Sequence, residues 1–116
     1  MIEAYVYTSC TSCRKTIEQL KASGAAFRSR DYFRDRFTRA ELTDVLARAG
    51  LTPREILSRR SKVYLARAGE IDALDDDALL DLMLQEPTLL RRPLVIKGGR
   101  HLVGHNQRAL EDLIAS

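Results

Sequence analysis

Two cysteines, Cys10 and Cys13, are the residues whose type and spacing most directly suggest chemistry. They form a CxxC motif within the small, polar segment TSCTSC. A cysteine at the start of a helix is stabilised as a thiolate by unpaired N–H groups and by the helix dipole. We therefore expect Cys10 to be a nucleophile. Cys13, nearly one turn further on, would resolve the mixed adduct by forming a Cys10–Cys13 disulfide.

Two other interpretations of the cysteines are open. A pair of buried structural cysteines would need apolar neighbours, whereas the surrounding residues are polar. A zinc site is the second interpretation, because His101 and His105 have H-x3-H spacing and complete a Cys2His2 set. However, 87 residues separate Cys13 from His101, which is unlike the spacing of a zinc finger.

Composition restricts the class of protein. The chain has 116 residues, of which 45% are hydrophobic and 30% charged, and this predicts one folded domain over residues 1–116. It has no apolar run long enough to span a membrane, and its first residues, MIEAYVYT, do not resemble a signal peptide. Two cysteines are too few for a secreted disulfide scaffold. We therefore expect a cytoplasmic monomer with no membrane association.

Charge is distributed unevenly along the chain. Residues 1–67 contain 14 Lys and Arg against 7 Asp and Glu, whereas residues 68–116 contain 5 against 9. The basic half either attracts an anion or an acidic partner, or is a solvated surface without one. No recognition-helix signature accompanies the positive charge, so we expect no direct sequence-specific binding of DNA.

The elements around the CxxC motif are predicted from hydrophobic periodicity. A strand over residues 2–7 precedes it, and the helix after it ends at Gly24. A second strand is expected over residues 26–32. Near the C-terminus, residues 94–97 and 100–103 form a hairpin through Gly98-Gly99, and a final helix begins at Asn106.

The middle of the chain is predicted to be helical. A capping box from Thr38 to Glu41 begins a helix that ends at Gly50, and Thr52-Pro53 begins a short helix through Leu57. Three acids at 75–77 begin another helix, which ends before Pro87. The resulting order is β-α-β, two or three inserted helices, and β-β-α. We therefore expect an α/β fold whose mixed sheet of about four strands is covered by helices.

Four segments together resemble the ArsC/Spx family of glutaredoxin-coupled arsenate reductase-like proteins and Spx-type regulators. They are YTSCTSCRK at 7–15, RRSKVY at 59–64, LLRRPLVI at 89–96 and VGHN at 103–106. The resemblance covers essentially the whole chain. It implies a thioredoxin-like fold with a helical insertion at about residues 38–90. It also implies that no cofactor is bound and that glutathione, glutaredoxin or thioredoxin supplies the electrons.

The same resemblance implies roles for residues far from the cysteines in sequence. Arg92-Pro93 would form a cis-proline loop facing Cys10, and Arg60 and Arg92 would stabilise a thiolate or a bound oxyanion. The anion-binding set implied in this way is Ser12, Arg60, Lys62, Arg92 and Pro93. Arg91 is expected to be only a solvated neighbour.

Two functions follow from the two branches of the family. The first is an arsenate reductase-like thiol oxidoreductase, although the stretch Leu102 to His105 lacks the further arginine that the reductases carry there. The second is a redox-sensing regulator that binds the C-terminal domain of the RNA polymerase alpha subunit. Cys13 and the CTSC segment are closer to Spx, whereas Gly50-Leu51-Thr52-Pro53 resembles the reductase branch.

Overall fold

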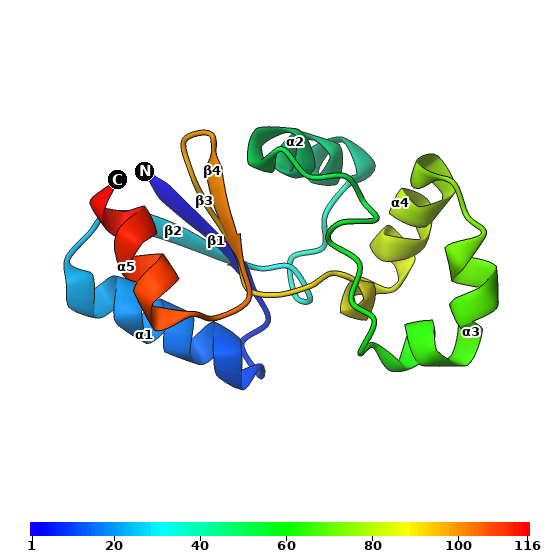
Figure 1. Cartoon of the computed structure of the whole chain (residues 1–116), viewed down its shortest axis with the longest axis horizontal. Helices are drawn as coiled ribbons and strands as arrows, with labels where there is room; N and C mark the ends of the chain where they lie inside the picture. The colour runs from blue at the N-terminus through cyan, green and yellow to red at the C-terminus, as the bar shows by residue number, and fades with distance from the viewer.

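Strand β1 (Ile2–Val6) lies inside a four-stranded sheet of order β2-β1-β3-β4 in the computed structural model, which describes residues 1–116 (Figure 1). Strand β2 (Phe27–Asp31) runs parallel to β1, whereas β3 (Leu94–Lys97) is antiparallel to β1 and to β4 (Arg100–Val103). The predicted mixed sheet is therefore confirmed. The hairpin between β3 and β4 turns at Gly98, whose φ of 60° favours glycine.

Helices α1 (Thr11–Ser23) and α5 (Gln107–Ala115) cover one face of the sheet (Figure 1). The alternation in β1 places Ile2, Ala4 and Val6 on this face, where they pack with Leu20 and Leu110. All five side chains are buried. This face therefore supports the start of α1, where Cys10 lies.

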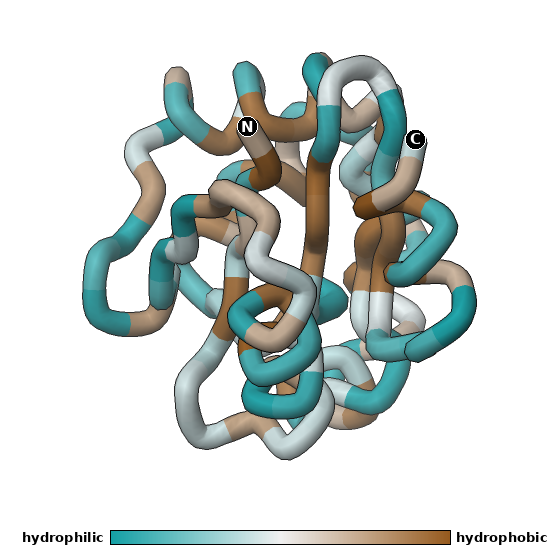
Figure 2. Tube along the Cα trace, turned by 90° about the vertical axis from the view of Figure 1, so that its left-hand side faces the viewer, coloured by the Kyte–Doolittle hydropathy of each residue, from teal (hydrophilic) through white to brown (hydrophobic).

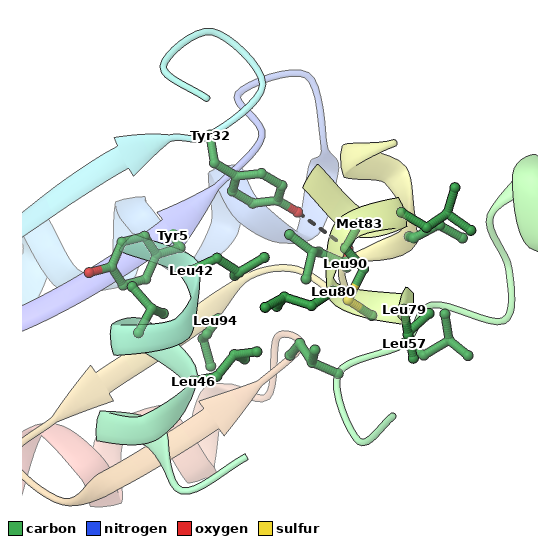
Figure 3. Packing of buried hydrophobic residues seen from close by; sticks show 14 of the residues in the cluster. Tyr5, Tyr32, Leu42, Leu46, Leu57, Leu79, Leu80, Met83, Leu90 and Leu94 are labelled. Carbon is green, nitrogen blue, oxygen red and sulfur yellow. Dashed lines mark hydrogen bonds between the residues drawn. The ribbon is translucent and has the colours of Figure 1, made fainter. Parts of the chain in front are cut away.

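The inserted helices form a second hydrophobic cluster on the other side of the sheet. They are α2 (Arg39–Ala49), α3 (Lys62–Asp72) and α4 (Asp76–Gln85), followed by a 3-10 turn over Pro87–Leu89. Figure 3 shows this cluster, in which Tyr5 and Leu94 from the sheet pack with Leu42, Leu46 and residues of α4. Along the whole trace, hydrophobic residues gather in the interior and hydrophilic residues on the outside (Figure 2).

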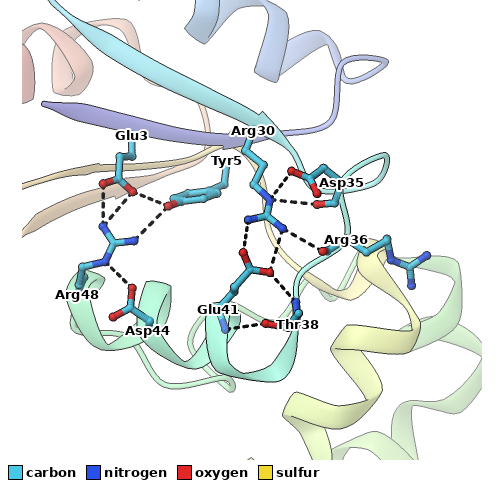
Figure 4. A network of polar contacts seen from close by, with 9 residues as sticks. All are labelled: Glu3, Tyr5, Arg30, Asp35, Arg36, Thr38, Glu41, Asp44 and Arg48. Atoms are coloured by element: carbon cyan, nitrogen blue, oxygen red, sulfur yellow. Dashed lines mark hydrogen bonds and ion pairs between the residues drawn. The ribbon is translucent and has the colours of Figure 1, made fainter.

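Polar contacts hold α2 against the sheet (Figure 4). Arg48 donates to both carboxylate oxygens of Glu3 at 3.0 and 2.9 Å and to the Tyr5 hydroxyl at 3.2 Å. At the other end of α2, Glu41 completes the predicted capping box with Thr38 and accepts a hydrogen bond from Arg30 at 2.8 Å. Both ends of α2 are thus tied to neighbouring strands.

One expectation for the insertion differs from the structure, and for one of its helices, α3, the sequence offers no prediction. The predicted short helix through Leu57 is wrong, because residues 53–56 form successive turns with hydrogen bonds to the third preceding residue. Helix α3 carries no clear periodic signal, since only Tyr64 and Ile71 of its residues are buried. It also contains a kink, with non-helical φ and ψ of −133° and 27° at Arg67. A helix with so little buried surface depends on its neighbours more than on its own pattern.

Candidate active site

Cys10 is the N-cap residue of α1, at the end of the short turn that follows β1. Its backbone is extended, with φ −86° and ψ 126°, and its carbonyl accepts the first helical hydrogen bond from the Arg14 N–H at 3.0 Å. The side chain is half-buried and makes no capping hydrogen bond to the helix N–H groups. The thiol is therefore placed where the start of a helix favours negative charge.

Cys13 lies one turn further along α1 and points inward. It is 1% exposed and packs with Val6 and Leu20, and the Tyr7 N–H donates to its Sγ at 3.4 Å. The polarity of the flanking residues does not predict this burial, because a residue three positions along a helix turns onto the inner face. Burial raises the pKa of the Cys13 thiol to about 12, and the negative charge on Cys10 adds to this effect.

The pKa of the Cys10 thiol is shifted in the opposite direction, below its ordinary value. Partial burial alone would raise its pKa, but the nearby backbone N–H of Cys13, the Cys13 thiol and the backbone N–H of Ser12 stabilise the thiolate and outweigh burial. The positive charge of Arg92 acts in the same direction, so the pKa of Cys10 is below its ordinary value. The two thiols of one motif therefore differ in reactivity, with Cys10 as the group that ionises first.

The turn that carries Cys10 is fixed by Asp31 at the end of β2. One carboxylate oxygen accepts from the Thr8 N–H at 3.2 Å and the Thr8 hydroxyl at 2.8 Å. The other accepts from the N–H groups of Phe33 and Arg34 at 2.9 and 3.2 Å. Burial opposes ionisation of Asp31, but these hydrogen bonds prevail and lower its pKa. Asp31 thus joins the loops that follow the two parallel strands.

Arg92 lies near Cys10, and the Arg92–Pro93 peptide bond is cis. Its guanidinium lies 5.9 Å from the ring centre of Tyr7 and 5.5 Å from that of Phe33, and these rings stack at 3.9 Å. Arg92 donates to the Leu90 carbonyl at 3.3 Å, while its buried Nε has no partner. The aromatic pair holds this charge close to the thiol without neutralising it.

A cavity of about 410 Å³ opens beside Cys10. Its seven lining residues come from four separate segments and include three arginines: Cys10, Ser12, Ser58, Arg60, Arg91, Arg92 and Gly104. The cavity contains no acidic side chain. It is therefore suited to an anion that reaches the Cys10 sulfur.

Backbone contacts between two loops place these arginines together. Leu57 and Leu90 form an isolated antiparallel bridge. Next to it, the Ser58 N–H donates to the Leu89 carbonyl at 2.7 Å, and the Arg91 N–H donates to the Ile56 carbonyl at 2.8 Å. This bridge connects the loop that carries Arg60 with the loop that carries Arg91 and Arg92.

The structure gathers four of the residues expected at the site, namely Cys10, Ser12, Arg60 and Arg92. Lys62 is exposed at the start of α3, and Pro93 is buried behind Arg92, so neither lines the cavity. Ser58 and Gly104 have no signal in the sequence that would place them in the wall of this cavity. Arg91, expected to be only a solvated neighbour, is exposed but also lines the cavity, because the loop bridge turns it that way.

The histidines of the zinc hypothesis do not join the cysteines. His101 is exposed on β4, and His105 Nδ1 lies 2.9 Å from the hydroxyl oxygen of the buried Thr16. The structure brings together no group of three or more His, Cys, Asp or Glu side chains that could hold a metal ion. The Cys2His2 interpretation is therefore wrong for this arrangement.

A larger cavity of about 550 Å³ lies at the β2 side of the sheet, lined by residues that include Glu3, Tyr5, Arg28, Arg30 and Arg48. It has no thiol, and its charged groups pair with one another or with neighbouring acids. We therefore place the chemistry at Cys10 despite the smaller cavity there.

The chain belongs to the ArsC family, whose model matches residues 5–113. It is 37% identical to the regulatory protein MgsR of Bacillus subtilis over 102 residues, which are 88% of this chain and 81% of MgsR. It is 33% identical to the global transcriptional regulator Spx of Streptococcus agalactiae over 107 residues, 92% of this chain and 78% of that regulator.

Solved structures establish the thioredoxin-like fold. The arsenate reductase of Vibrio cholerae superimposes with a TM-score of 0.78 over 98% of this chain and 95% of its own, at 24% identity. A glutaredoxin of Archaeoglobus fulgidus superimposes with a TM-score of 0.52 over 99% and 86%, at 22% identity. The expected fold, a mixed sheet with a helical insertion, is confirmed. None of the helices has the length and apolar character needed to cross a bilayer.

Proposed function

We propose that this chain is a thiol–disulfide redox protein that uses Cys10 and Cys13. The observation that carries the proposal is the contrast between the two thiols: Cys10 borders an arginine-lined cavity and has a lowered pKa, whereas Cys13 is buried behind it and has a raised pKa. In such a pair the more exposed thiolate attacks the substrate disulfide, and the buried thiol then resolves the mixed disulfide. A reducing compartment such as the cytoplasm suits free thiols.

In the first step, the Cys10 thiolate attacks one sulfur of a disulfide substrate. The substrate S–S bond breaks, a mixed disulfide forms on Cys10, and the leaving thiolate takes a proton from solvent. Arg60 and Arg92 favour this step because they border the path of the anionic sulfur. The Tyr7–Phe33 pair keeps Arg92 in place during the reaction.

In the second step, Cys13 attacks the Cys10 sulfur and releases the second thiol of the substrate. Burial is the main reason for the raised pKa of Cys13, but the charge on Cys10 contributes. Once Cys10 carries a mixed disulfide, that charge is gone and Cys13 ionises more readily. The first step thus prepares the second, and Cys13 is not activated before substrate is bound.

The electrons that restore the dithiol come from another thiol system, namely glutathione with glutaredoxin, or thioredoxin. The proposed mechanism uses side chains of the chain alone and involves no bound cofactor. All steps are thiol–disulfide exchanges, which these donors can reverse.

Two cysteine variants test this function. After exposure to glutathione disulfide, the wild-type protein should contain an internal Cys10–Cys13 disulfide, whereas Cys13→Ser should retain one glutathione on Cys10. Cys10→Ser cannot form an internal disulfide, and its one remaining thiol, the buried Cys13, should take up glutathione only slowly. Mass spectrometry of the intact protein and of its tryptic peptides measures these products. Wild-type protein that keeps both thiols free under these conditions would contradict the proposal.

A second candidate is a redox-sensing regulator that binds the C-terminal domain of the RNA polymerase alpha subunit. Its support is that curated relatives at 33–37% identity carry the names Spx and MgsR and are regulators. In this case the Cys10–Cys13 disulfide is a signal that alters a binding surface. Binding of the purified alpha domain to reduced and oxidised protein tests the candidate, and absence of binding in both states rejects it.

Arsenate turnover belongs to the first candidate and needs its own test. An arsenical bound to Cys10 would be held by charge-assisted donors, and the cavity offers Arg60, Arg91 and Arg92. The stretch Leu102 to His105 contributes no arginine to it. A glutaredoxin-coupled assay with arsenate, run beside a model disulfide and beside Cys10→Ser, separates the two activities.

A further inference from the structure

A second cavity adjoins the one at Cys10. It has a volume of about 310 Å³ and is lined by Arg54, Glu55, Leu57, Ser58, Arg59, Arg60 and Arg91. Three of these residues, Ser58, Arg60 and Arg91, also line the cavity at Cys10. The two cavities therefore lie side by side, and together they are here called the arginine groove, which begins at Cys10 and follows residues 54–60.

The arginine groove carries a strong positive charge. Five arginines line it, Arg54, Arg59, Arg60, Arg91 and Arg92, against one acid, Glu55. Four of the five, Arg54, Arg60, Arg91 and Arg92, take part in no ion pair of the structure, whereas Arg59 lies 3.9 Å from a carboxylate oxygen of Asp72. The charge of the arginines without an ion pair is thus available to a ligand.

Arg54, Arg59 and Glu55 also have local hydrogen-bond partners. Arg54 donates to the Ile71 carbonyl at 3.2 Å, and Arg59 donates to the Tyr64 hydroxyl at 3.0 Å. The Glu55 carboxylate accepts from the N–H and hydroxyl of Thr52, both at 3.0 Å, and makes no ion pair with the arginines. Apart from Arg59, the arginines of the groove therefore have no acidic partner to compensate their charge.

The groove extends beyond the volume that the reacting sulfur needs, and this indicates a substrate with several anionic groups. Resting on the redox function proposed above, we propose that the disulfide substrate is a polypeptide whose cysteine is flanked by acidic residues that lie along the arginine groove. Carboxylates match guanidinium groups in charge and in bidentate geometry. A polypeptide is favoured over a nucleic acid because the groove leads to a thiolate, with which a peptide disulfide can exchange.

The reaction of such a peptide balances within the protein. The Cys10 thiolate attacks one of the two sulfurs of the substrate disulfide, and the other sulfur leaves as a thiolate. The half that was attacked, either the peptide or the group bound to its cysteine, stays on Cys10 as a mixed disulfide. Cys13 loses a proton and displaces that half as a thiol. The two thiols of the protein are oxidised to one disulfide, and the substrate disulfide is reduced to two thiols.

Single-turnover kinetics with pre-reduced protein in excess test this substrate class. Three short peptides are compared, each with one central cysteine linked to thionitrobenzoate and flanked by Glu, Gln or Lys. At low salt the Glu peptide should release thionitrobenzoate about tenfold faster than the Gln peptide, because opposite charges steer association, and the Lys peptide should be slowest. Raising the salt to about 1 M should remove most of the difference.

Variants locate the effect in the groove. Arg60→Gln and Arg91→Gln should each lower the Glu-to-Gln rate ratio, and the ratio cancels any change in the Cys10 pKa itself. Arg108→Gln is the matched control, because this exposed arginine of α5 lies outside the groove and in no ion pair. Its ratio should equal that of wild type.

The outcomes separate the two proposals. Failure of the Gln peptide and of a small neutral disulfide to oxidise Cys10 would reject the redox function itself. Equal rates for all three peptides at low salt would leave the redox function standing and overturn the acidic-peptide inference. Equal peptide rates together with tight binding of a single-stranded oligonucleotide that Arg91→Gln abolishes would assign the groove to nucleic acid instead.

Discussion

Cys10 and Cys13 are three residues apart, yet their surroundings give them different chemistry. Nearby N–H groups, the Cys13 thiol and Arg92 stabilise the Cys10 thiolate, overcome partial burial and lower the pKa of Cys10, whereas burial raises the pKa of Cys13. The CxxC motif predicts that such a pair exists, and the helix N-terminus predicts which cysteine reacts first. The motif does not predict the depth of burial of Cys13, which depends on the packing of α1 against β1.

The pH dependence of alkylation measures this contrast. Iodoacetamide should modify Cys10 with a midpoint below about 8.5, the value of an ordinary thiol, and should leave Cys13 unmodified through that range. Arg92→Gln should move the midpoint upward, because the thiolate loses a nearby positive charge. The exposed Arg100→Gln on β4 is the control and should leave the midpoint unchanged. Equal reactivity of both cysteines in folded protein would contradict the assignment.

The arginines of the site show where sequence reasoning reaches its limit. Arg60 and Arg92 can be placed near Cys10 only through the resemblance of their motifs, since neither composition nor periodicity assigns a role to an arginine. Ser58 and Arg91 lack even that indication. Their position results from the Leu57–Leu90 bridge, a contact between loops more than thirty residues apart in sequence.

At the scale of elements, strands and capped helices are well predicted. The alternation of β1, the capping box of α2 and the glycine turn between β3 and β4 each specify one local conformation. The helix predicted over residues 52–57 is wrong because Thr52 and Pro53 are also favoured in turns, and residues 53–56 form turns. Helix α3 has too few buried positions for a periodic signal.

Asp31 offers a test of how the strand ends position the catalytic turn. Asp31→Asn retains one oxygen and sets an NH2 group against N–H donors. We therefore expect the free energy of unfolding at neutral pH to fall by about 1–2 kcal/mol. The substitution should also slow the reaction of Cys10, because the Thr8 turn is released. Urea unfolding and the alkylation rate measure the two effects.

The effect of Asp31→Asn on stability should depend on pH. The folded pKa of Asp31 is below the ordinary value of 3.8, so its carboxylate stabilises the folded state fully above that value. This stabilisation is lost as the pH falls from about 4 through the lower folded pKa. Wild type and variant should therefore converge in acid, and a constant difference down to the lowest pH would contradict an electrostatic role.

At the scale of the whole molecule, one sheet separates two hydrophobic clusters. The cluster under α1 and α5 supports the cysteines, and the larger one joins the insertion to the sheet through Tyr5, Leu94 and Ile96. The molecule extends 43 × 25 × 24 Å, with the insertion at one end of its long axis (Figure 1). The redox motif and most of the arginine groove thus lie on different parts of the fold.

Unfolding of a core variant tests whether these parts behave as one unit. Leu79 in α4 is fully buried. Leu79→Ala should lower the free energy of unfolding by about 2–5 kcal/mol because it leaves a cavity in the core. If the larger cluster couples the insertion to the sheet, circular dichroism and tyrosine fluorescence should report one shared transition. Ala115→Gly, an exposed change at the end of α5, should cost far less.

Two separate transitions for Leu79→Ala, with the Cys10 reaction intact after the first, would show that the insertion unfolds independently. The arginine groove would then be lost before the thiol chemistry, and the preference for acidic peptides would disappear at lower urea than alkylation of Cys10.

The bridge between Leu57 and Leu90 also bears on how this site could change over evolutionary time. Main-chain hydrogen bonds set the path of both loops, so the side chains at 59 and 91 can be exchanged while the scaffold beneath them persists. A lineage could therefore reverse the charge that the groove selects in a few substitutions and retain the same pair of thiols. The loop bridge would separate the choice of substrate from the chemistry performed on it.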